Sequence, residues 1–310
     1  MKLPPHSLAA LAAVVLSVPP TGLMALSDAD AAAGRAVGKQ YADAIVGVEL
    51  MATIDLSIGD RALPPREVRL EANGTVISPD GLTATSLIEI DPRRTAEAAT
   101  RNLTLPGAQR VKVGETAYHD VKLRLANGAE IPAKVVLTNA DLDLAFITPE
   151  VDPAAPKREF VCVKLDNAAE PAILANYFVL SRASQSLKRV SEVHASTIEG
   201  VVEDDPHRLY LPNGFATGCP MIDAQGKVLG LCLTQMVDGH PIMVGGRPSG
   251  VVVSAADVAS IAQPLFPAKP APVVTPAATP SAPAPAAAPA PSGTMAAASG
   301  SASTVAQNNP

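Results

Sequence analysis

Residues 214–223 read GFATGCPMID, and residues 226–231 continue with GKVLGL. Glycine and proline open this stretch as a tight loop, and the apolar residues that follow are typical of two short strands. Residues 223–226 (DAQG) supply the turn between the strands, because Gly226 can adopt a positive φ at no steric cost. The stretch therefore predicts a β-hairpin that is entered through a glycine-rich loop.

The same stretch resembles the nucleophile loop of trypsin-like serine proteases, above all the Deg or high-temperature-requirement (HtrA) group. The pattern of that group reads G-N-S-G-G-P-L-x-(D/N)-x-x-G-x-(V/L)-(I/V)-G. Six residues of this chain fit it: Gly218, Pro220, Asp223, Gly226, Val228 and Gly230. Thr217 stands in the place of the nucleophilic serine, and Phe215, Ala216 and Cys219 replace the pattern's Gly, Asn and second Gly. The resemblance implies the frame of a protease active site with altered chemistry.

A second match to this protease group lies upstream, in residues 74–88. Residues 79–81 (PDG) are a strong turn signal between two β-rich runs. The group often reads G-x-V-I-(S/D)-x-D-G-x-(I/V)-(L/V)-T-N-x-H-V here, with the catalytic histidine seven residues after the turn glycine. The same count in this chain reaches Ile88, while Thr85 and Ser86 fit the small polar residues before the histidine. The resemblance therefore implies that the general base is missing.

A third match covers residues 139–147, NADLDLAFI. They resemble the family segment D-x-x-x-D-(L/I)-A-(L/V)-(L/I), whose last aspartate orients the catalytic histidine, and Asp143 occupies that position. The hairpin turn at Asn127-Gly128 precedes it at a fitting spacing. Without a histidine partner, Asp143 could instead cap a turn or accept backbone hydrogen bonds.

The three matches together imply a degenerate catalytic triad at Ile88, Asp143 and Thr217. They place the oxyanion-hole region at Phe215, Ala216 and Thr217. A side chain at Phe215, where the pattern has glycine, can turn the peptide N–H away from the site.

Short strand signals recur along the chain at the regular spacing of barrels and sandwiches. The expected strands cover residues 41–56, 67–78, 121–125, 131–137, 160–165, 175–180, 190–200 and 250–253. Residues 92–117 read as an exposed insertion with a short helix over 95–101, and residues 152–156 as a proline-rich joint. Ser254 and Asp257 form a capping box that opens a late helix.

We therefore expect an all-β fold, a trypsin-like double antiparallel β-barrel with a short C-terminal helix. The first six-stranded barrel is expected over 41–150, and the second barrel with the helix over 157–266. Residues 267–310 are Pro, Ala, Ser and Thr with almost no charge, which predicts a disordered tail where family members often carry a PDZ domain.

The N-terminal residues 1–31 predict a signal peptide and small-residue leader. A charged start precedes an apolar run over residues 7–18, which is about half of the ~20 residues that span a bilayer. Cleavage near Ala25 or Ala31 fits the small residues there. The alternative is an ordinary alanine-rich buried helix. Export would place the mature protein in the periplasm, the cell envelope or outside the cell.

Composition excludes several function classes. The net charge is −6, and no basic run is interleaved with aromatic residues, which argues against nucleic acid and anionic lipid as partners. Of three cysteines, Cys219 and Cys232 face each other in the predicted hairpin, where a disulfide is possible. We favour free buried thiols over that disulfide, and one thiol is left over in any case. No ligand spacing suggests a metal, and nothing indicates a cofactor.

Acyl transfer needs a base within reach of the nucleophile and a third group that orients the base. Ile88 cannot accept a proton, and an internal Thr217 lacks the N-terminal amine that serves other threonine nucleophiles. The remaining candidate histidines read as structural or exposed: His119, His194, His207 and His240.

Three function hypotheses follow from these observations. The first is an exported pseudoprotease that binds peptide or protein in a remnant cleft, with no membrane span after signal removal. The second is a divergent serine-type endopeptidase with Thr217 as nucleophile. The third is a structural protein of the cell envelope that uses its tail as a spacer.

Overall fold

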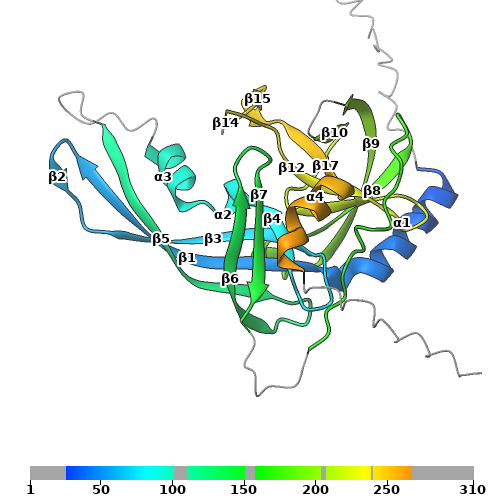
Figure 1. Cartoon of the computed structure of the whole chain (residues 1–310), viewed down its shortest axis with the longest axis horizontal. Helices are drawn as coiled ribbons and strands as arrows, with labels where there is room; N and C mark the ends of the chain where they lie inside the picture. Colours follow the sequence, from blue (N-terminus) through cyan, green and yellow to red (C-terminus); the bar gives the residue numbers. More distant parts are fainter. Residues whose placement is uncertain (1–25, 101–109, 151–157, 204–206, 239, 267–310) are drawn as a thin grey trace, which may run out of the picture. The chain divides into compact units, whose positions relative to one another are not determined.

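The computed structural model describes residues 26–100, 110–150, 158–203, 207–238 and 240–266. Within these residues the chain forms two closed antiparallel β-barrels of six strands each, and a short helix follows the last strand (Figure 1). This arrangement confirms the predicted all-β double barrel with its C-terminal helix.

The first barrel runs in the order β1-β3-β4-β7-β6-β5 and closes where β5 pairs with β1. Its strands are β1 (Ile45–Ile58), β3 (Arg66–Val76), β4 (Thr83–Ser86), β5 (Val111–Arg124), β6 (Glu130–Asn139) and β7 (Leu144–Pro149), and β2 (Arg61–Ala62) pairs with the end of β1. β1 is buried without a break from Ile45 to Leu50 because both of its faces are covered. Val46, Val48 and Leu50 face the barrel interior, while Ile45 joins the core shared with the second barrel.

The second barrel runs in the order β10-β17-β12-β11-β8-β9 and closes between β9 and β10. Its strands are β8 (Asn176–Arg182), β9 (Ser191–Glu203), β10 (Arg208–Pro212), β11 (Cys219–Ile222), β12 (Val228–Thr234) and β17 (Gly250–Ser254). The predicted hairpin is β11 and β12, and Gly226 in its turn has the positive φ that was expected, at 81°. Two small ribbons lie between β12 and β17: β13 (Met236–Val237) with β14 (His240–Pro241), and β15 (Met243–Val244) with β16 (Arg247–Pro248).

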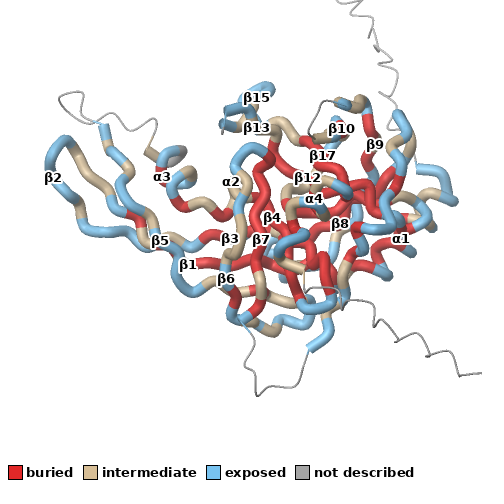
Figure 2. The backbone as a smooth tube through the Cα atoms, in the orientation of Figure 1, coloured by how far each residue is buried: buried red, intermediate tan, exposed pale blue. Residues whose placement is uncertain are grey.

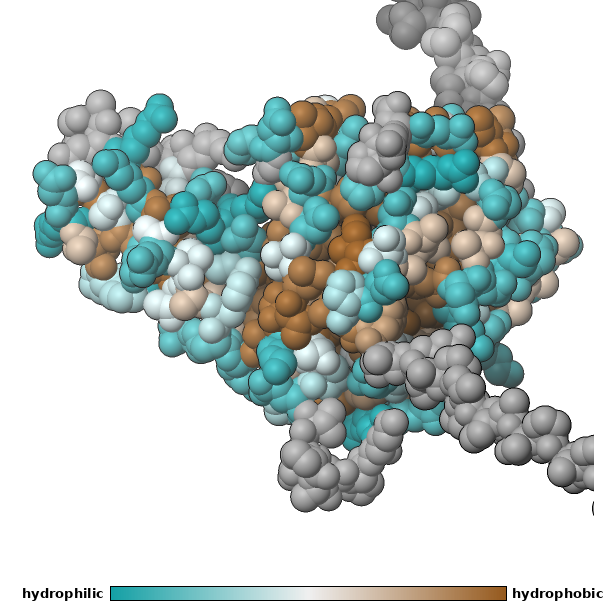
Figure 3. All heavy atoms as spheres, viewed as in Figure 1, coloured by the Kyte–Doolittle hydropathy of each residue, from teal (hydrophilic) through white to brown (hydrophobic). Residues whose placement is uncertain are grey.

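A shared core joins the two barrels. Phe146 of the first barrel belongs to the same buried cluster as Phe178, Leu231 and Val253 of the second. Buried backbone runs continuously through both barrels in Figure 2. Apolar side chains reach the surface between the β6–β7 hairpin and α4 (Ala255–Ala262), as the brown area of Figure 3 shows. The two barrels are therefore held against each other mainly by apolar burial.

The helices follow local signals and packing. Ser254 caps α4 by accepting a hydrogen bond from the backbone N–H of Asp257 at 3.1 Å, which confirms Ser254 as the N-cap of the predicted capping box. The other helices are α1 (Asp28–Tyr41), α2 (Leu87–Ile90) and α3 (Pro92–Thr100), and 3-10 turns occur at η1 (Ala42–Ala44), η2 (Gln185–Leu187) and η3 (Gln263–Leu265). None of the helices in the described ranges is long and apolar enough to cross a membrane.

The helix α1 was not predicted. It begins within the residues that we assigned to the leader and packs against the second barrel, where Gly34 lets the ring of Phe178 come close. The Tyr41 hydroxyl donates a hydrogen bond to the Gly226 carbonyl at 3.0 Å. The segment therefore contributes to the folded body at least from Ser27, which accepts a hydrogen bond from Asp30 N–H as the helix cap.

Two sequence predictions about local structure were wrong. Residues 160–165 form no strand; they cross to the first barrel, where Phe160 N–H donates to Pro79 O and Val163 N–H to Val76 O. The expected insertion over 92–117 is shorter, because β5 already begins at Val111 and pairs with β1. The proline-rich joint at 152–156, the tail over 267–310 and residues 1–25 of the leader lie outside the described residues.

Candidate functional site

Asp143 organises the contact between the barrels. Its side chain is 0 % exposed and accepts three hydrogen bonds, from Ser86 Oγ at 2.8 Å, Ile88 N at 2.7 Å and Thr234 N at 2.8 Å. Its carbonyl oxygen also accepts a bond from Leu87 N at 3.0 Å. The aspartate therefore caps the short helix α2 and ties it to β12 of the second barrel.

The backbone and charge of Asp143 are both unusual. Its φ is 56°, in the left-handed region that non-glycine residues rarely adopt, and the surrounding hydrogen bonds hold it there. Burial raises the pKa of the Asp143 carboxyl, while the bonds from Ile88 N, Thr234 N and Ser86 oppose that shift. The carboxylate oxygens of Asp143 thus accept hydrogen bonds from groups of the fold itself. This agrees with the alternative that the sequence left open, in which Asp143 caps a turn or accepts backbone hydrogen bonds.

Glu89 brings a second carboxyl group to this contact. It follows Ile88 in α2, and the Thr217 hydroxyl of the second barrel donates a hydrogen bond to Glu89 Oε1. Burial raises the pKa of Glu89 to about 7, the negative charge of Asp143 adds to the increase, and the Thr217 hydrogen bond opposes it. The Thr217 hydroxyl is therefore hydrogen-bonded to a carboxyl group whose pKa is near neutrality.

The sequence analysis missed Glu89. The family pattern quoted for residues 74–88 continues with valine after the histidine, and this chain has glutamate there. The replacement of the pattern's valine by Glu89 was the only sign in the sequence that this position differs from the family. Sequence alone could not show that the carboxyl reaches across to Thr217, because the two residues lie 128 positions apart.

Thr217 lies in a loop of residues 214–218, called the Thr217 loop below. Its two glycines have positive φ, 96° at Gly214 and 73° at Gly218. A Cβ on Gly218 would overlap the carbonyl oxygen of Asn73, so only glycine fits where the loop passes the first barrel.

Both ends of the Thr217 loop are fixed by hydrogen bonds. Ser196 Oγ donates to Gly214 O at 2.8 Å at one end. At the other, Thr75 Oγ1 donates to Gly218 O and Gly218 N to Cys232 O, each at 2.8 Å. The loop is therefore built into both barrels at its ends.

Phe215 and Ala216, predicted to belong to an oxyanion-hole region, lie in the middle of this loop. Both pack against the apolar interior of the second barrel. The ring of Phe215 lies against Gly250 at the start of β17, where an added Cβ would overlap it. The phenyl ring thus occupies the space beside Gly250 that a smaller residue would leave open.

The structure brings Ile88, Asp143 and Thr217 to the same region, around α2. Among the described residues, no histidine is bonded to any of them. Ile88 N–H binds Asp143, and Thr217 binds Glu89, the neighbour of Ile88. In the described residues, no hydrogen bond or ion pair joins a histidine to Thr217. The candidate histidines lie elsewhere: His119 faces Glu67, His194 faces Ser181 and Glu192, His207 faces Asp257, and His240 belongs to β14.

The disulfide that the sequence allowed is not formed, and the free thiols that it favoured are present. Cys219 and Cys232 are paired across β11 and β12 as expected, but both are free thiols, like Cys162. Burial raises the pKa of Cys232 to about 12 and that of Cys219 well above its usual range. Both thiols act as small apolar core groups. Across the described part of the chain, no three His, Cys, Asp or Glu side chains gather as metal ligands do.

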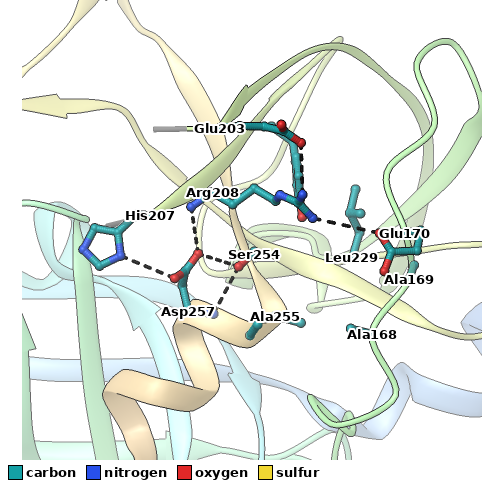
Figure 4. A pocket seen from close by; sticks show the side chains of 12 residues that line it. Ala168, Ala169, Glu170, Glu203, His207, Arg208, Leu229, Ser254, Ala255 and Asp257 are labelled. Atoms are coloured by element: carbon teal, nitrogen blue, oxygen red, sulfur yellow. Dashed lines mark hydrogen bonds and ion pairs between the residues drawn. The ribbon is translucent and has the colours of Figure 1, made fainter. Parts of the chain in front are cut away.

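A cavity of about 470 Å³ lies away from the Thr217 loop, at the beginning of α4 (Figure 4). Asp257 sits between Ser254 Oγ at 2.5 Å and His207 Nδ1 at 3.4 Å, and it also accepts a bond from Arg208 N at 3.0 Å. Because the carboxylate separates the hydroxyl from the imidazole, these residues do not form a nucleophile–base pair. The cavity therefore does not rival the Thr217 loop as a candidate active site.

Comparisons with known proteins agree with this fold. Residues 72–231 match the family model described as a trypsin-like peptidase domain. No curated protein matches the chain.

The solved structures that resemble the chain include those of AlgW, MamO and Deg5. A variant of the HtrA-type protease AlgW with a decapeptide has a TM-score of 0.51 at 10% identity, covering 75% of this chain and 66% of that one. The MamO protease domain from Magnetospirillum magneticum has a TM-score of 0.43 at 18% identity, covering 71% and 96%. Deg5 has a TM-score of 0.47 at 16% identity, covering 76% and 94%.

Proposed function

Because the chain belongs to the trypsin-like peptidase domain family, we propose that it is a pseudoprotease that binds peptide or protein segments without cleaving them. One observation carries this proposal: Ile88, which cannot accept a proton, occupies the position where the family pattern has its histidine. The Thr217 hydroxyl, at the nucleophile position, is bonded instead to the Glu89 carboxyl group.

The assignment of triad-equivalent positions is supported by hydrogen bonds. Ile88 donates its backbone N–H to Asp143, so the two residues are adjacent. Thr217 reaches the same helix, α2, through Glu89. We therefore assign Ile88, Asp143 and Thr217 to the base, orienting and nucleophile positions, with Phe215 and Ala216 in the oxyanion-hole region.

Three features argue against peptide hydrolysis. Ile88 has no group that accepts a proton, and loss of the base in a serine protease triad costs on the order of 10⁶ in turnover. The bonds that Asp143 accepts come from the scaffold groups Ser86, Ile88 and Thr234, so it is not bonded to Glu89 as an orienting group would be. The side chain that contacts the Thr217 hydroxyl is the Glu89 carboxyl group and not the imidazole that the triad of serine proteases uses as its base.

We propose peptide binding because the chain keeps the double-barrel fold of the trypsin-like peptidase domain. The surface where two barrels meet is shaped by the fold and not by the triad, so it can still bind a ligand when the chemistry is absent. The similar AlgW structure is described with a decapeptide. We therefore take a peptide or an unfolded protein segment as the ligand class.

We further propose that the protein is exported and loses residues before Ser27. The charged start and the apolar run over residues 7–18 support a signal peptide. Cleavage near Ala25 would leave α1 whole, whereas cleavage near Ala31 would remove its first turn and the Ser27 cap. N-terminal sequencing of the mature protein tests this choice.

The Glu89–Thr217 hydrogen bond favours one alternative, a divergent serine-type endopeptidase. In that reaction ionised Glu89 would take the proton of the Thr217 hydroxyl as Oγ1 attacks a peptide carbonyl carbon, and would return the proton to the leaving amine. The alternative requires Glu89 to be ionised, so any activity would rise with pH through about 7.

Two assays with the mature protein separate these functions. A fluorophosphonate probe and a quenched mixed-sequence peptide should give no labelling and no cleavage, with trypsin as positive control. Fluorescence polarisation should detect binding of a labelled random decapeptide pool or of casein. Labelling that disappears in Thr217→Ala and Glu89→Gln would establish the endopeptidase instead. Absence of both binding and labelling would overturn both functions.

A further inference from the structure

We propose that Glu89 determines the specificity of the peptide-binding surface, and that its carboxylate pairs with a lysine or arginine side chain of the ligand. The inference rests on the proposed function, because it names the class of peptide that the same site takes. It gives a role to a side chain that the family pattern lacks, since the pattern has valine after its histidine and this chain has Glu89 after Ile88.

The two carboxyl oxygens of Glu89 are in different situations. The Thr217 hydroxyl donates its hydrogen bond to Oε1, so Glu89 is the acceptor in this contact. Oε2 has no hydrogen-bond partner among the described residues. In that same part of the chain, the buried side-chain nitrogen or oxygen that lacks a partner is Nε of Arg189, so Oε2 must reach solvent. A ligand can therefore bind Oε2 without breaking the bond to Thr217.

The charge of Glu89 has no cationic partner in the described part of the chain: no lysine, arginine or histidine there forms an ion pair with it. Glu49 of β1 shows the opposite arrangement, because Arg69, Arg124 and Arg189 all pair with its carboxylate. A carboxylate that is partly removed from water is stabilised by an opposite charge. The fold supplies that charge at Glu49, and the ligand is left to supply it at Glu89.

The acidities of the two glutamates agree with this difference. Burial raises the pKa of Glu49, but its arginine partners outweigh that effect, so the pKa is lowered. Burial also raises the pKa of Glu89, and the negative charge of Asp143 adds to the increase. A bound ammonium or guanidinium group would favour the ionised form of Glu89 and would thereby gain affinity.

Asp143 adds to the preference for a cation without binding the ligand itself. Its side chain is 0 % exposed, and it accepts bonds from Ser86, Ile88 and Thr234, so it has no surface that a ligand could contact. Its negative charge still acts on the region around Glu89. The net charge of −6 further favours the approach of a basic ligand over an acidic one.

The Thr217 loop offers apolar surface for the stem of a long basic side chain. Phe215 and Ala216 immediately precede Thr217, and both are only partly buried. Lysine and arginine lay their methylene groups along apolar surface while the charged end meets its partner. A phenyl ring also attracts a guanidinium group across its face. A lysine or arginine side chain therefore fits this surface better than a small cation does.

Fluorescence polarisation of the full mature protein tests the inference. Three labelled decapeptide pools share the same neutral mixed sequence and differ at one fixed central residue, which is arginine, glutamine or glutamate. We expect the arginine pool to bind about tenfold more tightly than the glutamine pool, because a charge-assisted hydrogen bond replaces a neutral one. The glutamate pool should bind most weakly. Equal affinities for the three pools contradict the role of Glu89.

Two matched variants assign the preference to one carboxyl group. Glu89→Gln keeps the size of the side chain and an acceptor for the Thr217 hydroxyl, so it should bind the arginine and glutamine pools equally. Glu203→Gln removes the same charge from a carboxyl group that pairs with Arg208, and it should keep the wild-type preference. A preference for arginine that persists in folded Glu89→Gln contradicts the inference.

A small probe separates this inference from the proposed function. N-acetyl-arginine amide should shift the amide NMR resonances of residues 88–90 and 215–218 in the isotope-labelled wild type, and this measurement needs no variant. Such shifts without decapeptide binding would keep the cation site and remove peptide binding. Decapeptide binding that does not depend on charge, without such shifts, would keep peptide binding and remove the cation site. Absence of both would overturn both.

Discussion

Two carboxyl groups meet where the barrels touch, and they are held very differently. Asp143 is completely buried and accepts hydrogen bonds from Ser86, Ile88 and Thr234. Glu89 is only partly buried, and the hydrogen bond described for its side chain comes from the Thr217 hydroxyl. One carboxyl group is part of the scaffold, and the other is a side chain whose charge can change.

The difference shows which of the two carboxyl groups the fold depends on. An aspartate that caps a helix and joins two barrels stabilises the fold whether or not a histidine stands beside it. Glu89, the residue after Ile88, accepts one described side-chain hydrogen bond, and burial raises its pKa to about 7. The following predictions test this contrast between a structural and a titratable carboxyl group.

The largest effect is expected for Asp143→Ala. The substitution leaves the N–H groups of Ile88 and Thr234 buried without an acceptor, which should lower the free energy of unfolding by about 3–5 kcal/mol. Asp143→Asn keeps one acceptor oxygen and should lose less. Urea unfolding followed by circular dichroism measures both. If Asp143→Ala were as stable as the wild type, Asp143 would not have the scaffold role.

Gly218→Ala should come next. The new Cβ meets the Asn73 carbonyl, and a φ of 73° strains any side chain, so a loss of about 2–4 kcal/mol is expected. Gly214→Ala is the matched control, because its φ is also positive but no atom lies within 4 Å of an added Cβ. Unfolding midpoints should rank wild type, Gly214→Ala, Gly218→Ala. A reversed ranking would contradict the close approach of the loop to the first barrel.

Glu89→Gln should stabilise the protein at alkaline pH. The folded-state pKa of Glu89 is about 7, above its ordinary value of 4.5. Protonated Glu89 therefore contributes its full stabilisation to the folded state below pH 4.5, and this stabilisation is lost as the pH rises through 7. The wild type should therefore lose about 1–3 kcal/mol relative to Glu89→Gln between pH 5 and pH 8. Thermal melts across this range measure the difference. Parallel stability curves would exclude an elevated pKa.

The smallest effect is expected for Thr217. The hydroxyl stabilises ionised Glu89, so Thr217→Val should raise the pKa of Glu89 further and cost about 0.5–1 kcal/mol at pH 8. Thr217→Ser keeps the hydroxyl and should behave as the wild type. Infrared titration of the Glu89 carboxyl band gives the pKa in each variant. An unchanged pKa in Thr217→Val would mean that the hydrogen bond does not control it.

Sequence patterns predicted the elements that local rules govern. The turn at Gly226, the capping box at Ser254 and the hairpin of β11 and β12 were all found, because each depends on residues close together in the chain. Alternating segments gave most strands of both barrels. Predictions failed where pairing between distant segments decides whether a strand forms. Residues 160–165 are apolar enough for a strand, but they make single backbone hydrogen bonds to Val76 and Pro79 and no strand ladder.

Some residues of the candidate site could likewise be found from short motifs, and one could not. The positions of Ile88, Asp143 and Thr217 could be counted along three short motifs. Glu89 could not be recognised as a site residue, because its contact with Thr217 forms only when the two barrels pack together.

The amino-acid sequence by itself determined most strands, the hairpin turn and the helix cap, since these follow from periodicity and turn chemistry. The double barrel, and Ile88 at the position counted for the histidine, were predicted from the resemblance to trypsin-like proteases. Only the tertiary structure decided that Asp143 serves as a cap, that Cys219 and Cys232 are free thiols, and that Glu89 faces Thr217. The physical reason is that burial and hydrogen bonding between residues distant in the chain set these roles, and neither exists before the barrels pack together.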